Sequence, residues 1–195
     1  GAELFLPDAI IPRRLFATMA EQRTEIFLGI PTLYRQLLQS RFEAPPLPAL
    51  RFLLSSTAPL PESLVTDFDD RFGLPICQHY GSSETGAVAT HVPTEVRARP
   101  DSAGRPIGGV TVRIVRPDGT EAPPGEEGEV VVSGPTVAIG YVMGGPTPSP
   151  FANGTYRMGD AGVMIDGFLH LRGRLDDMIN VGGFKVWPEI GRAHV

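Results

Sequence analysis

The feature that most constrains the fold is an alternation of short apolar segments with longer amphipathic ones in the first half of the chain. Residues 24–29 (TEIFLG), 50–56 (LRFLLSS) and 74–80 (LPICQHY) have the length and apolar content of short buried strands. Between them, residues 31–42 and 61–73 carry apolar side chains at helical spacing. This strand–helix alternation predicts a parallel sheet covered by helices.

Proline and glycine mark the ends of the predicted helices. A further helix is predicted over residues 13–23, directly after Pro12, because proline suits the first turn of a helix. The helix predicted over 31–42 begins with a proline in the same way. Gly73 is expected to end the helix before the third strand, since glycine is common just after a helix C-terminus.

From Gly104 onward the pattern changes to short strands separated by glycine and proline. Residues 109–115 (GVTVRIV) alternate apolar and polar side chains, and a Pro-Asp-Gly turn follows. Residues 162–174 predict a hairpin that turns at Asp166-Gly167. We therefore expect an α/β fold: a parallel sheet with flanking helices (residues 1–103), followed by a small antiparallel β-barrel-like subdomain (residues 104–174).

The composition narrows the classes of function. The formal net charge is −5 and the chain has no basic block, so we expect no nucleic-acid partner. A single cysteine, Cys77, excludes an internal disulfide framework and a Cys-rich zinc site, and we expect it to be a core residue rather than a nucleophile. No apolar run approaches the roughly 20 residues that span a bilayer, and no signal-peptide pattern is present. We expect a cytoplasmic protein without a membrane span.

Residues 78–86 (QHYGSSETG) gather hydroxyl, aromatic and carboxylate groups after a predicted parallel strand. Ligands of open parallel sheets bind beyond such strand ends. Here Tyr80 could stack on a base, Ser83 could donate to a phosphate oxygen and Glu84 could bind a hard divalent cation. Residues 55–61 (SSTAPLP) follow another strand in the same way. From the residues alone, a solvated glycine- and serine-rich turn explains the segment equally well.

A second polar cluster follows in the β-rich half. Asp160 lies between Gly159 and Ala161, where its carboxylate could accept two hydrogen bonds from a ribose diol. Arg174 follows fourteen residues later. A surface turn with an ordinary Arg–Asp ion pair would account for the same residues.

Taken in order, these motifs resemble those of the adenylate-forming (ANL) superfamily, which contains acyl-CoA synthetases, firefly luciferases and the adenylation domains of peptide synthetases. The YG-x-T-E motif of that family is matched by residues 80–84 and its Y-x-T-G-D motif by residues 156–160. Its G-R-x-D/K-D-x-I-x-x-x-G-x-x-V-x-P motif is matched by residues 173–188. The stretches IPTLYRQLL and STAPLP match two further family segments. Five motifs in family order are specific where each alone would be weak.

The resemblance implies that the chain is an internal fragment of the large N-terminal domain of an AMP-forming carboxylic acid–CoA ligase. Such an enzyme uses ATP and Mg²⁺ to convert a small carboxylic acid into an acyl-adenylate, releasing pyrophosphate, and then passes the acyl group to coenzyme A. Two alternatives stay open. One is an adenylation domain that loads the thiol of a carrier protein, and the other is a non-catalytic β-rich interaction module that keeps the fold.

The resemblance also implies roles for individual residues. Ser83 would contact the α-phosphate and Glu84 would hold Mg²⁺, both as catalytic residues. Asp160 would bind the ribose hydroxyls of ATP or AMP, and Arg174 would assist at the ribose or a phosphate. The adenine and acyl pockets would be lined by Thr57, Ala58, Pro59, Gln78, His79, Tyr80 and Gly81. We expect Glu84, Asp160 and Arg174 to converge on one cavity shaped for a nucleoside monophosphate.

One position in the first of these motifs and one directly before it depart from the family pattern. Ser83 replaces the usual threonine and keeps the hydroxyl. His79 replaces the glycine of many relatives, where it could shorten the acyl pocket or pack against the sheet.

The end of the chain carries the last predictions from the resemblance. Asp176 matches a hinge about which a small C-terminal domain rotates, and Gly182 and Gly183 match a loop that approaches the pantetheine arm of coenzyme A. We expect residues 175–188 to form the hinge and the start of that domain. Residues 189–195 (EIGRAHV) are expected to be a non-native tail. The family's phosphate-binding loop and its catalytic C-terminal lysine match nothing here, so we expect the chain alone to be inactive.

Overall fold

The computed structural model describes residues 3–7, 10–41, 45–143, 149–175, 179–181 and 184–186, the last two ranges by their backbone alone. The chain divides into two compact units. The first comprises Gly1–Gln78 with Val92–Pro100, and the second comprises His79–His91 with Asp101–Val195. The predicted subdomain bounds, 1–103 and 104–174, stay predictions.

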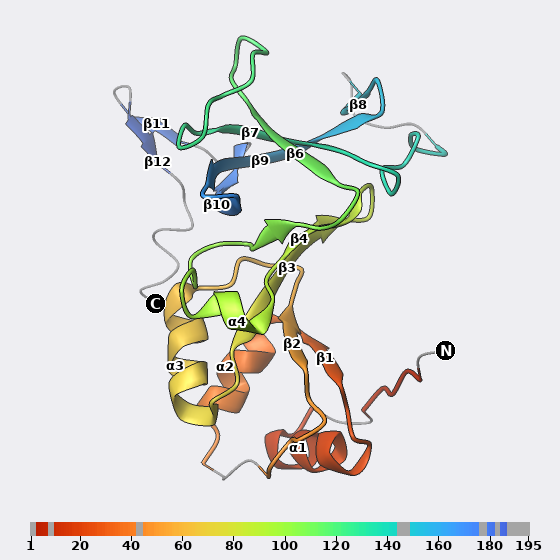
Figure 1. The fold of residues 1–195 in the computed structure, drawn as a ribbon, viewed down its shortest axis with the longest axis vertical. Coiled ribbons are helices and arrows are strands. Elements are labelled where there is room, and N and C mark those ends of the chain that lie inside the picture. The colour runs from red at the N-terminus through yellow and green to blue at the C-terminus, as the bar shows by residue number, and fades with distance from the viewer. Residues whose placement is uncertain are drawn as a thin grey trace. The chain divides into compact units, whose positions relative to one another are not determined.

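The first unit is an α/β arrangement around a parallel sheet (Figure 1). Its elements are α1 (Pro12–Glu21), β1 (Ile26–Gly29), α2 (Pro31–Gln39), β2 (Phe52–Ser55), α3 (Glu62–Phe72), the first part of β3 (Ile76–Ser82) and α4 (Pro93–Val96). Strand β2 pairs in parallel with β1 on one side and with β3 on the other. The prediction of a parallel sheet with flanking helices is confirmed, and each predicted helix and strand up to residue 80 is present with ends shifted by a few residues.

The helices of the first unit are held by one apolar core. Helices α1 and α2 begin with proline, and α3 ends at Gly73, as predicted. Tyr34 of α2 and Phe68 of α3 are both fully buried, and their rings meet edge to face with centroids 5.5 Å apart. Full burial of one large apolar side chain stabilises the fold by about 1.5–3 kcal/mol. On β1, Ile26 and Leu28 remain 57% and 60% exposed, so the core lies against one face of that strand.

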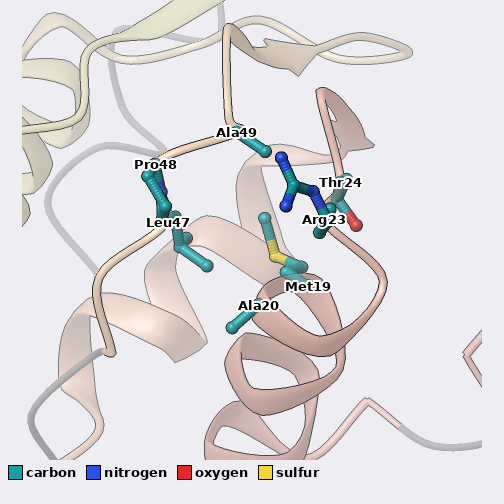
Figure 2. Close-up of a pocket in the computed structure, with 7 residues that line it drawn as sticks. All are labelled: Met19, Ala20, Arg23, Thr24, Leu47, Pro48 and Ala49. Carbon is teal, nitrogen blue, oxygen red and sulfur yellow. The ribbon is translucent and has the colours of Figure 1, made fainter.

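A pocket of about 250 Å³ opens in the first unit beside the C-terminal end of α1 (Figure 2). It is lined by Met19, Ala20, Arg23, Thr24, Leu47, Pro48 and Ala49. None of the residues that the motifs single out lines this pocket. It therefore does not belong to the predicted site.

Strand β3 runs from the first unit into the second, where its partner changes. Residues 79–82 pair antiparallel with β4 (Gly86–Thr90), which in turn pairs with β5 (Arg105–Pro106). The sequence predicts that this strand ends at Tyr80, and in the structure it continues to Ser82. Tyr80, Gly81 and Ser82 are still in the strand, because β4 supplies backbone partners that no local sequence pattern reveals.

The rest of the second unit is an antiparallel sheet with strand order β10-β9-β7-β6 (Figure 1). Its strands are β6 (Thr111–Val115), β7 (Gly128–Ser133), β8 (Phe151–Ala152), β9 (Thr155–Ile165) and β10 (Phe168–Arg174). Strand β8 pairs with β9 beside this path. The antiparallel barrel-like subdomain is confirmed, and so is the hairpin between β9 and β10. Its central residues Asp166 and Gly167 have φ of 51° and 81°, the left-handed conformation that this tight turn requires.

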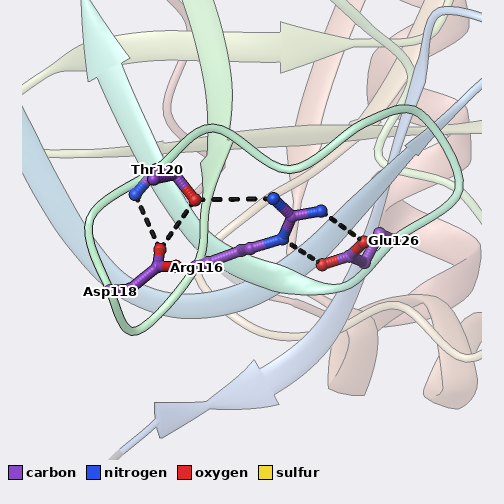
Figure 3. A network of polar contacts seen from close by, with 4 residues as sticks. All are labelled: Arg116, Asp118, Thr120 and Glu126. Carbon is purple, nitrogen blue, oxygen red and sulfur yellow. Dashed lines mark hydrogen bonds and ion pairs between the residues drawn. The ribbon is translucent and has the colours of Figure 1, made fainter.

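The connection between β6 and β7 is fixed by a small polar network (Figure 3). The Arg116 guanidinium forms a two-point pair with the Glu126 carboxylate, one of its hydrogen bonds being 2.8 Å long. Asp118 Oδ1 accepts hydrogen bonds from the Thr120 backbone N–H and hydroxyl at 2.9 and 2.7 Å. Exposed ion pairs contribute little to stability, so the network shapes this loop more than it stabilises the unit.

The last strands that the structure describes are β11 (Ile179–Val181) and β12 (Phe184–Val186), which form a two-stranded antiparallel ladder. The predicted hinge residue Asp176, the predicted coenzyme A loop at Gly182 and Gly183, and the predicted tail 189–195 lie outside the described residues. In the ranges that the structure describes, no helix has the length and apolarity that crossing a membrane demands.

Candidate functional site

The turn between β3 and β4 presents Ser83 and Glu84. The backbone N–H of Thr85 donates to the Ser82 carbonyl at 3.3 Å, and the N–H of Glu84 donates to Ser82 Oγ at 3.2 Å. Thr85 is fully buried, and its hydroxyl donates to the Gly86 carbonyl at 3.1 Å. The turn is thus closed by its own hydrogen bonds, which leave Ser83 exposed and Glu84 half-buried at its tip.

Glycine at position 81 is required by the close approach of the two strands. A Cβ atom on Gly81 would lie 2.1 Å from the backbone oxygen of Gly86. The β3–β4 register also shifts between Tyr80 and Gly81, as at a β-bulge. Bulges redirect the side chains that follow them, so this irregularity helps to set the direction of the turn that carries Glu84.

Two phenols surround the Glu84 carboxylate. Tyr141 Oη donates to Glu84 Oε1 at 2.9 Å, and the hydroxyl of Tyr156 lies 3.4 Å from that of Tyr141. Burial tends to raise the pKa of Glu84, but hydrogen bonds from Ser82, Tyr141, its own backbone N–H and Tyr156 outweigh it and lower the pKa below its usual value. Glu84 is therefore ionised at neutral pH.

Asp160 is held by one donor at each carboxylate oxygen. Tyr80 Oη donates to Oδ2 at 2.6 Å, and the Arg174 guanidinium donates to Oδ1 at 3.2 Å and to the Met158 carbonyl at 2.9 Å. The β9–β10 register places Asp160 and Arg174 opposite each other. Burial, followed by the neighbouring Asp160, raises the pKa of Tyr80, so its hydroxyl stays protonated and donates. Each oxygen of Asp160 can accept a further hydrogen bond.

The two carboxylates are connected through strand β9. Tyr156, which contributes to the surroundings of Glu84, and Asp160 both belong to this strand. Glu84, Asp160 and Arg174 all lie in the second unit, where Asp160 and Arg174 form an ion pair. Their convergence on one nucleotide-shaped cavity stays a prediction.

The predicted residues of the first unit lie at the end of β2. Thr57, Ala58 and Pro59 are exposed in the loop that follows this strand. Thr57 has a φ of 72°, a left-handed conformation that a β-branched residue rarely adopts. Such backbone strain is concentrated at functional sites, and the binding role of this loop stays a prediction.

The two remaining predicted residues are neighbours on β3. Gln78 is half-buried and stands opposite Ser55 of β2 in the parallel register. His79 is half-buried and stands opposite Thr90 of β4. The roles assigned to both stay predictions.

The groups that hold the two carboxylates were not predicted from the sequence. Tyr141 was not singled out, because it lies 57 residues from Glu84 and no local spacing indicates their contact. Tyr156 was seen only as part of a motif, and the hydrogen bond of Tyr80 to Asp160 spans 80 residues. Tyrosine near a glycine in a β-rich segment is too common a pattern to have revealed either contact.

The donor set suits one kind of metal ion. Among the residues that the structure describes, no group of three or more His, Cys, Asp or Glu side chains could form a preformed metal cage. A single ionised carboxylate at Glu84 fits Mg²⁺, which keeps several waters and binds through one or two carboxylates together with substrate phosphates. The residues present are therefore compatible with Mg²⁺ brought in with a nucleotide.

Comparison with known proteins establishes the family. Residues 1–142 match the family described as AMP-binding enzyme, and the chain belongs to this family. It is 36% identical over 193 residues to a feruloyl-CoA synthase from Amycolatopsis sp, an alignment that covers 96% of this chain and 39% of that protein. It is 29% identical over 187 residues to a D-alanine–D-alanyl carrier protein ligase from Bacillus cytotoxicus, covering 90% of this chain and 37% of that protein.

The fold agrees with the same assignment. The chain superposes on the o-succinylbenzoate coenzyme A synthetase of Bacillus subtilis, solved in complex with an acyl-adenylate intermediate, with a TM-score of 0.82 and 27% identity. This match covers 92% of the present chain and 37% of that one. The chain spans about two-fifths of the length of the relatives it matches. The predicted resemblance to adenylate-forming enzymes is confirmed.

Proposed function

We propose that the protein containing this chain is an AMP-forming acid–thiol ligase that activates a carboxylic acid with ATP and transfers the acyl group to coenzyme A. The observation that carries the proposal is the paired arrangement in the second unit. Glu84 is ionised between tyrosine hydroxyls, and Asp160 is held between Tyr80 and Arg174. Both carboxylates lie in sequence segments that resemble motifs of adenylate-forming enzymes, and the chain belongs to the AMP-binding enzyme family.

In the first step, a carboxylate oxygen of the acid attacks the α-phosphorus of ATP. The bond from that phosphorus to the bridging oxygen breaks, and pyrophosphate leaves with the electron pair. The exposed hydroxyl of Ser83 would donate a hydrogen bond to an α-phosphate oxygen as negative charge builds up there. Glu84 would hold Mg²⁺, which when bound neutralises phosphate charge. Catalysis of this kind consists mostly of positioning and charge stabilisation.

The nucleoside would be held by the second carboxylate. Asp160 would accept hydrogen bonds from the two ribose hydroxyls, because Tyr80 and Arg174 fix its orientation and leave acceptor capacity on both oxygens. Arg174 is half-exposed and charged at all working pH values, so it could also approach a phosphate. The strained loop at Thr57, Ala58 and Pro59, together with Gln78, His79, Tyr80 and Gly81, would line the adenine and acyl pockets.

In the second step, the thiol sulfur attacks the acyl carbonyl carbon of the adenylate. The bond from that carbon to the phosphate oxygen breaks, AMP leaves with the electron pair, and the thiol proton passes to solvent. Coenzyme A is the acceptor we propose, because relatives of this chain are named CoA synthases or ligases. A cytoplasmic location is part of the same proposal, since a lone buried cysteine suits a reducing compartment.

A carrier-protein thiol is the second candidate acceptor. The relative named as a D-alanine–D-alanyl carrier protein ligase supports it. The two acceptors are distinguished by offering either coenzyme A or a phosphopantetheine-bearing carrier protein to the complete protein and following thioester formation.

The test of the activity uses the complete coding sequence that contains this chain and a panel of carboxylic acids. We expect pyrophosphate release that depends on the acid, and a loss of kcat on the order of 100-fold for Glu84→Gln, since removal of one such electrostatic group costs about that much. Glu126→Gln is the matched control, because Glu126 is an exposed carboxylate paired with Arg116 in a loop. Equal turnover in Glu84→Gln and the wild type would contradict the proposed role of Glu84.

A further inference from the structure

We propose that Tyr141 is a positioning residue whose hydroxyl sets the direction of the Glu84 carboxylate toward the nucleotide-bound metal ion. The inference rests on the proposed function, because it gives Tyr141 a role only if Glu84 is a metal ligand. It goes further in assigning a role to a residue outside every motif that the sequence analysis used.

The first support is a two-point attachment between distant segments. The Tyr141 hydroxyl donates to Glu84 Oε1 at 2.9 Å, and the backbone N–H of Ala138 donates to the carbonyl of the same glutamate at 2.7 Å. The N–H of Val137 in turn donates to the Gly134 carbonyl at 3.2 Å, which shapes the chain just before Ala138. Residues 138–141 therefore hold both the backbone and the side chain of Glu84.

The second support is that the phenol itself is held in place. The ring of Tyr141 packs against Phe151 with centroids 5.2 Å apart and an interplanar angle of 73°. Phe151 packs in turn against Tyr156 at 4.8 Å. Tyr156 is only 8% exposed and its hydroxyl lies 3.4 Å from that of Tyr141. The rings of Phe151 and Tyr156 thus hold in place a tyrosine that is itself 42% exposed.

The consequence for Glu84 follows from its place in the fold. Glu84 lies at the tip of a turn, where a glutamate side chain has several accessible rotamers and loses entropy when it is fixed. A hydrogen bond from a braced donor fixes one carboxylate oxygen before any ligand arrives, so less ordering remains at the moment of binding. Loss of one such hydrogen bond to a charged group should weaken metal–nucleotide binding by about five- to tenfold.

The experiment compares Tyr141→Phe with the wild type in the complete protein, without carboxylic acid. Binding of Mn²⁺–ATP is followed by the relaxation enhancement of water protons, with Mn²⁺ standing in for Mg²⁺, and binding of metal-free ATP in EDTA is followed by calorimetry. We expect Tyr141→Phe to raise the dissociation constant of Mn²⁺–ATP by about five- to tenfold and to leave that of metal-free ATP unchanged. Tyr34→Phe is the matched control, because it removes a phenol hydroxyl that donates to the Leu54 carbonyl in the first unit.

The variant Glu84→Gln separates the two proposals. If Tyr141 acts through Glu84, the double variant Glu84→Gln/Tyr141→Phe binds Mn²⁺–ATP no more weakly than Glu84→Gln alone. If Glu84→Gln binds Mn²⁺–ATP as tightly as the wild type, the metal role of Glu84 is wrong and the inference fails with it. If Glu84→Gln binds weakly but Tyr141→Phe matches the wild type, only the positioning role is overturned. A loss of metal-free ATP binding in Tyr141→Phe would also overturn it, by indicating a general structural role.

Discussion

The two units of the chain each bury a tyrosine, and they use its hydroxyl in different ways. Tyr34 of the first unit is fully buried and donates to the backbone carbonyl of Leu54 at 2.8 Å, which ties α2 to β2. Tyr80 of the second unit is 9% exposed and donates to the side chain of Asp160 at 2.6 Å. Burial raises the pKa of both phenols. The Tyr34 hydroxyl stabilises the fold, whereas the Tyr80 hydroxyl holds the Asp160 side chain in place.

The same contrast extends to the buried polar residues. Among the residues that the structure describes, the first unit buries Ser55, whereas the second buries Thr85, His91, Ser102 and His170. Burying polar groups costs free energy unless they are hydrogen-bonded, and in the second unit Ser102 Oγ and His91 Nε2 share a hydrogen bond of 2.8 Å. Within the described residues, the second unit thus buries more polar side chains than the first, and one of them, Thr85, helps to close the turn that carries Glu84.

The largest expected effect comes from truncating a side chain in the apolar core of the first unit, which tests whether the two units differ in stability. Phe68 is fully buried and its ring contacts both Tyr34 and Phe72. We expect Phe68→Ala to lower the free energy of unfolding by about 3–5 kcal/mol, because it removes a large buried ring and leaves a cavity. Hydrogen exchange of the folded chain measures where protection is lost.

Protection should fall first in α2, α3 and β2, and remain in β7 and β9. The matched control is Phe5→Ala, since Phe5 is 48% exposed and should change protection little. An equal loss of protection in both units would show that they unfold together. The contrast between the two units would then not extend to their stability.

Removing the hydroxyl of Tyr34 or of Tyr80 should have effects of intermediate size. Tyr34→Phe should cost about 1 kcal/mol of stability by removing one hydrogen bond, and it should leave the KM for ATP of the complete protein unchanged. Tyr80→Phe removes the donor to Asp160 Oδ2 and should raise the KM for ATP by about fivefold. Urea unfolding and steady-state kinetics measure the pair. A raised KM in Tyr34→Phe, or an unchanged one in Tyr80→Phe, would contradict the contrast.

The smallest expected effect concerns Cys77 in the first unit. Its side chain is fully buried, and burial raises the pKa of the thiol to about 12. Because the thiolate is the reactive form, and only about one thiol in ten thousand would be ionised at pH 8, the folded chain should resist iodoacetamide. Mass spectrometry should detect the modified thiol only after unfolding in urea. Rapid modification of the folded chain would show that Cys77 is accessible and is not a core residue.

Local patterns predicted the elements of the first unit well. The apolar segments before and after α2 and α3 became β1, β2 and β3, and Gly73 ended α3. In the second unit the Asp166-Gly167 turn was predicted correctly. Each of these features depends on neighbours within a few residues in the sequence, and for that reason it can be read from spacing and residue type.

The pairing of β3 with β4 was not predicted, and it changed the interpretation of the QHYGSSETG segment. Residues 79–82 form a strand because Gly86–Thr90 returns beside them, and Gly81 fits because a larger side chain would meet the Gly86 carbonyl. Glycine is depleted in strands, so Gly81 did not favour a strand at this position. The hydrogen-bonding partner, rather than the local residues, decided the structure here.

The sequence alone was enough to indicate the family: an ordered set of motifs predicted an adenylate-forming enzyme, with Glu84, Asp160 and Arg174 as its candidate site residues, and the family match over residues 1–142 confirms the family. Only the tertiary structure decided how two of these groups are held, through Tyr141 at Glu84 and Tyr80 at Asp160. The physical reason is that hydrogen bonds across 57 and 80 residues depend on strand register and side-chain packing. Those are properties of the folded chain as a whole, and no window of the sequence contains them.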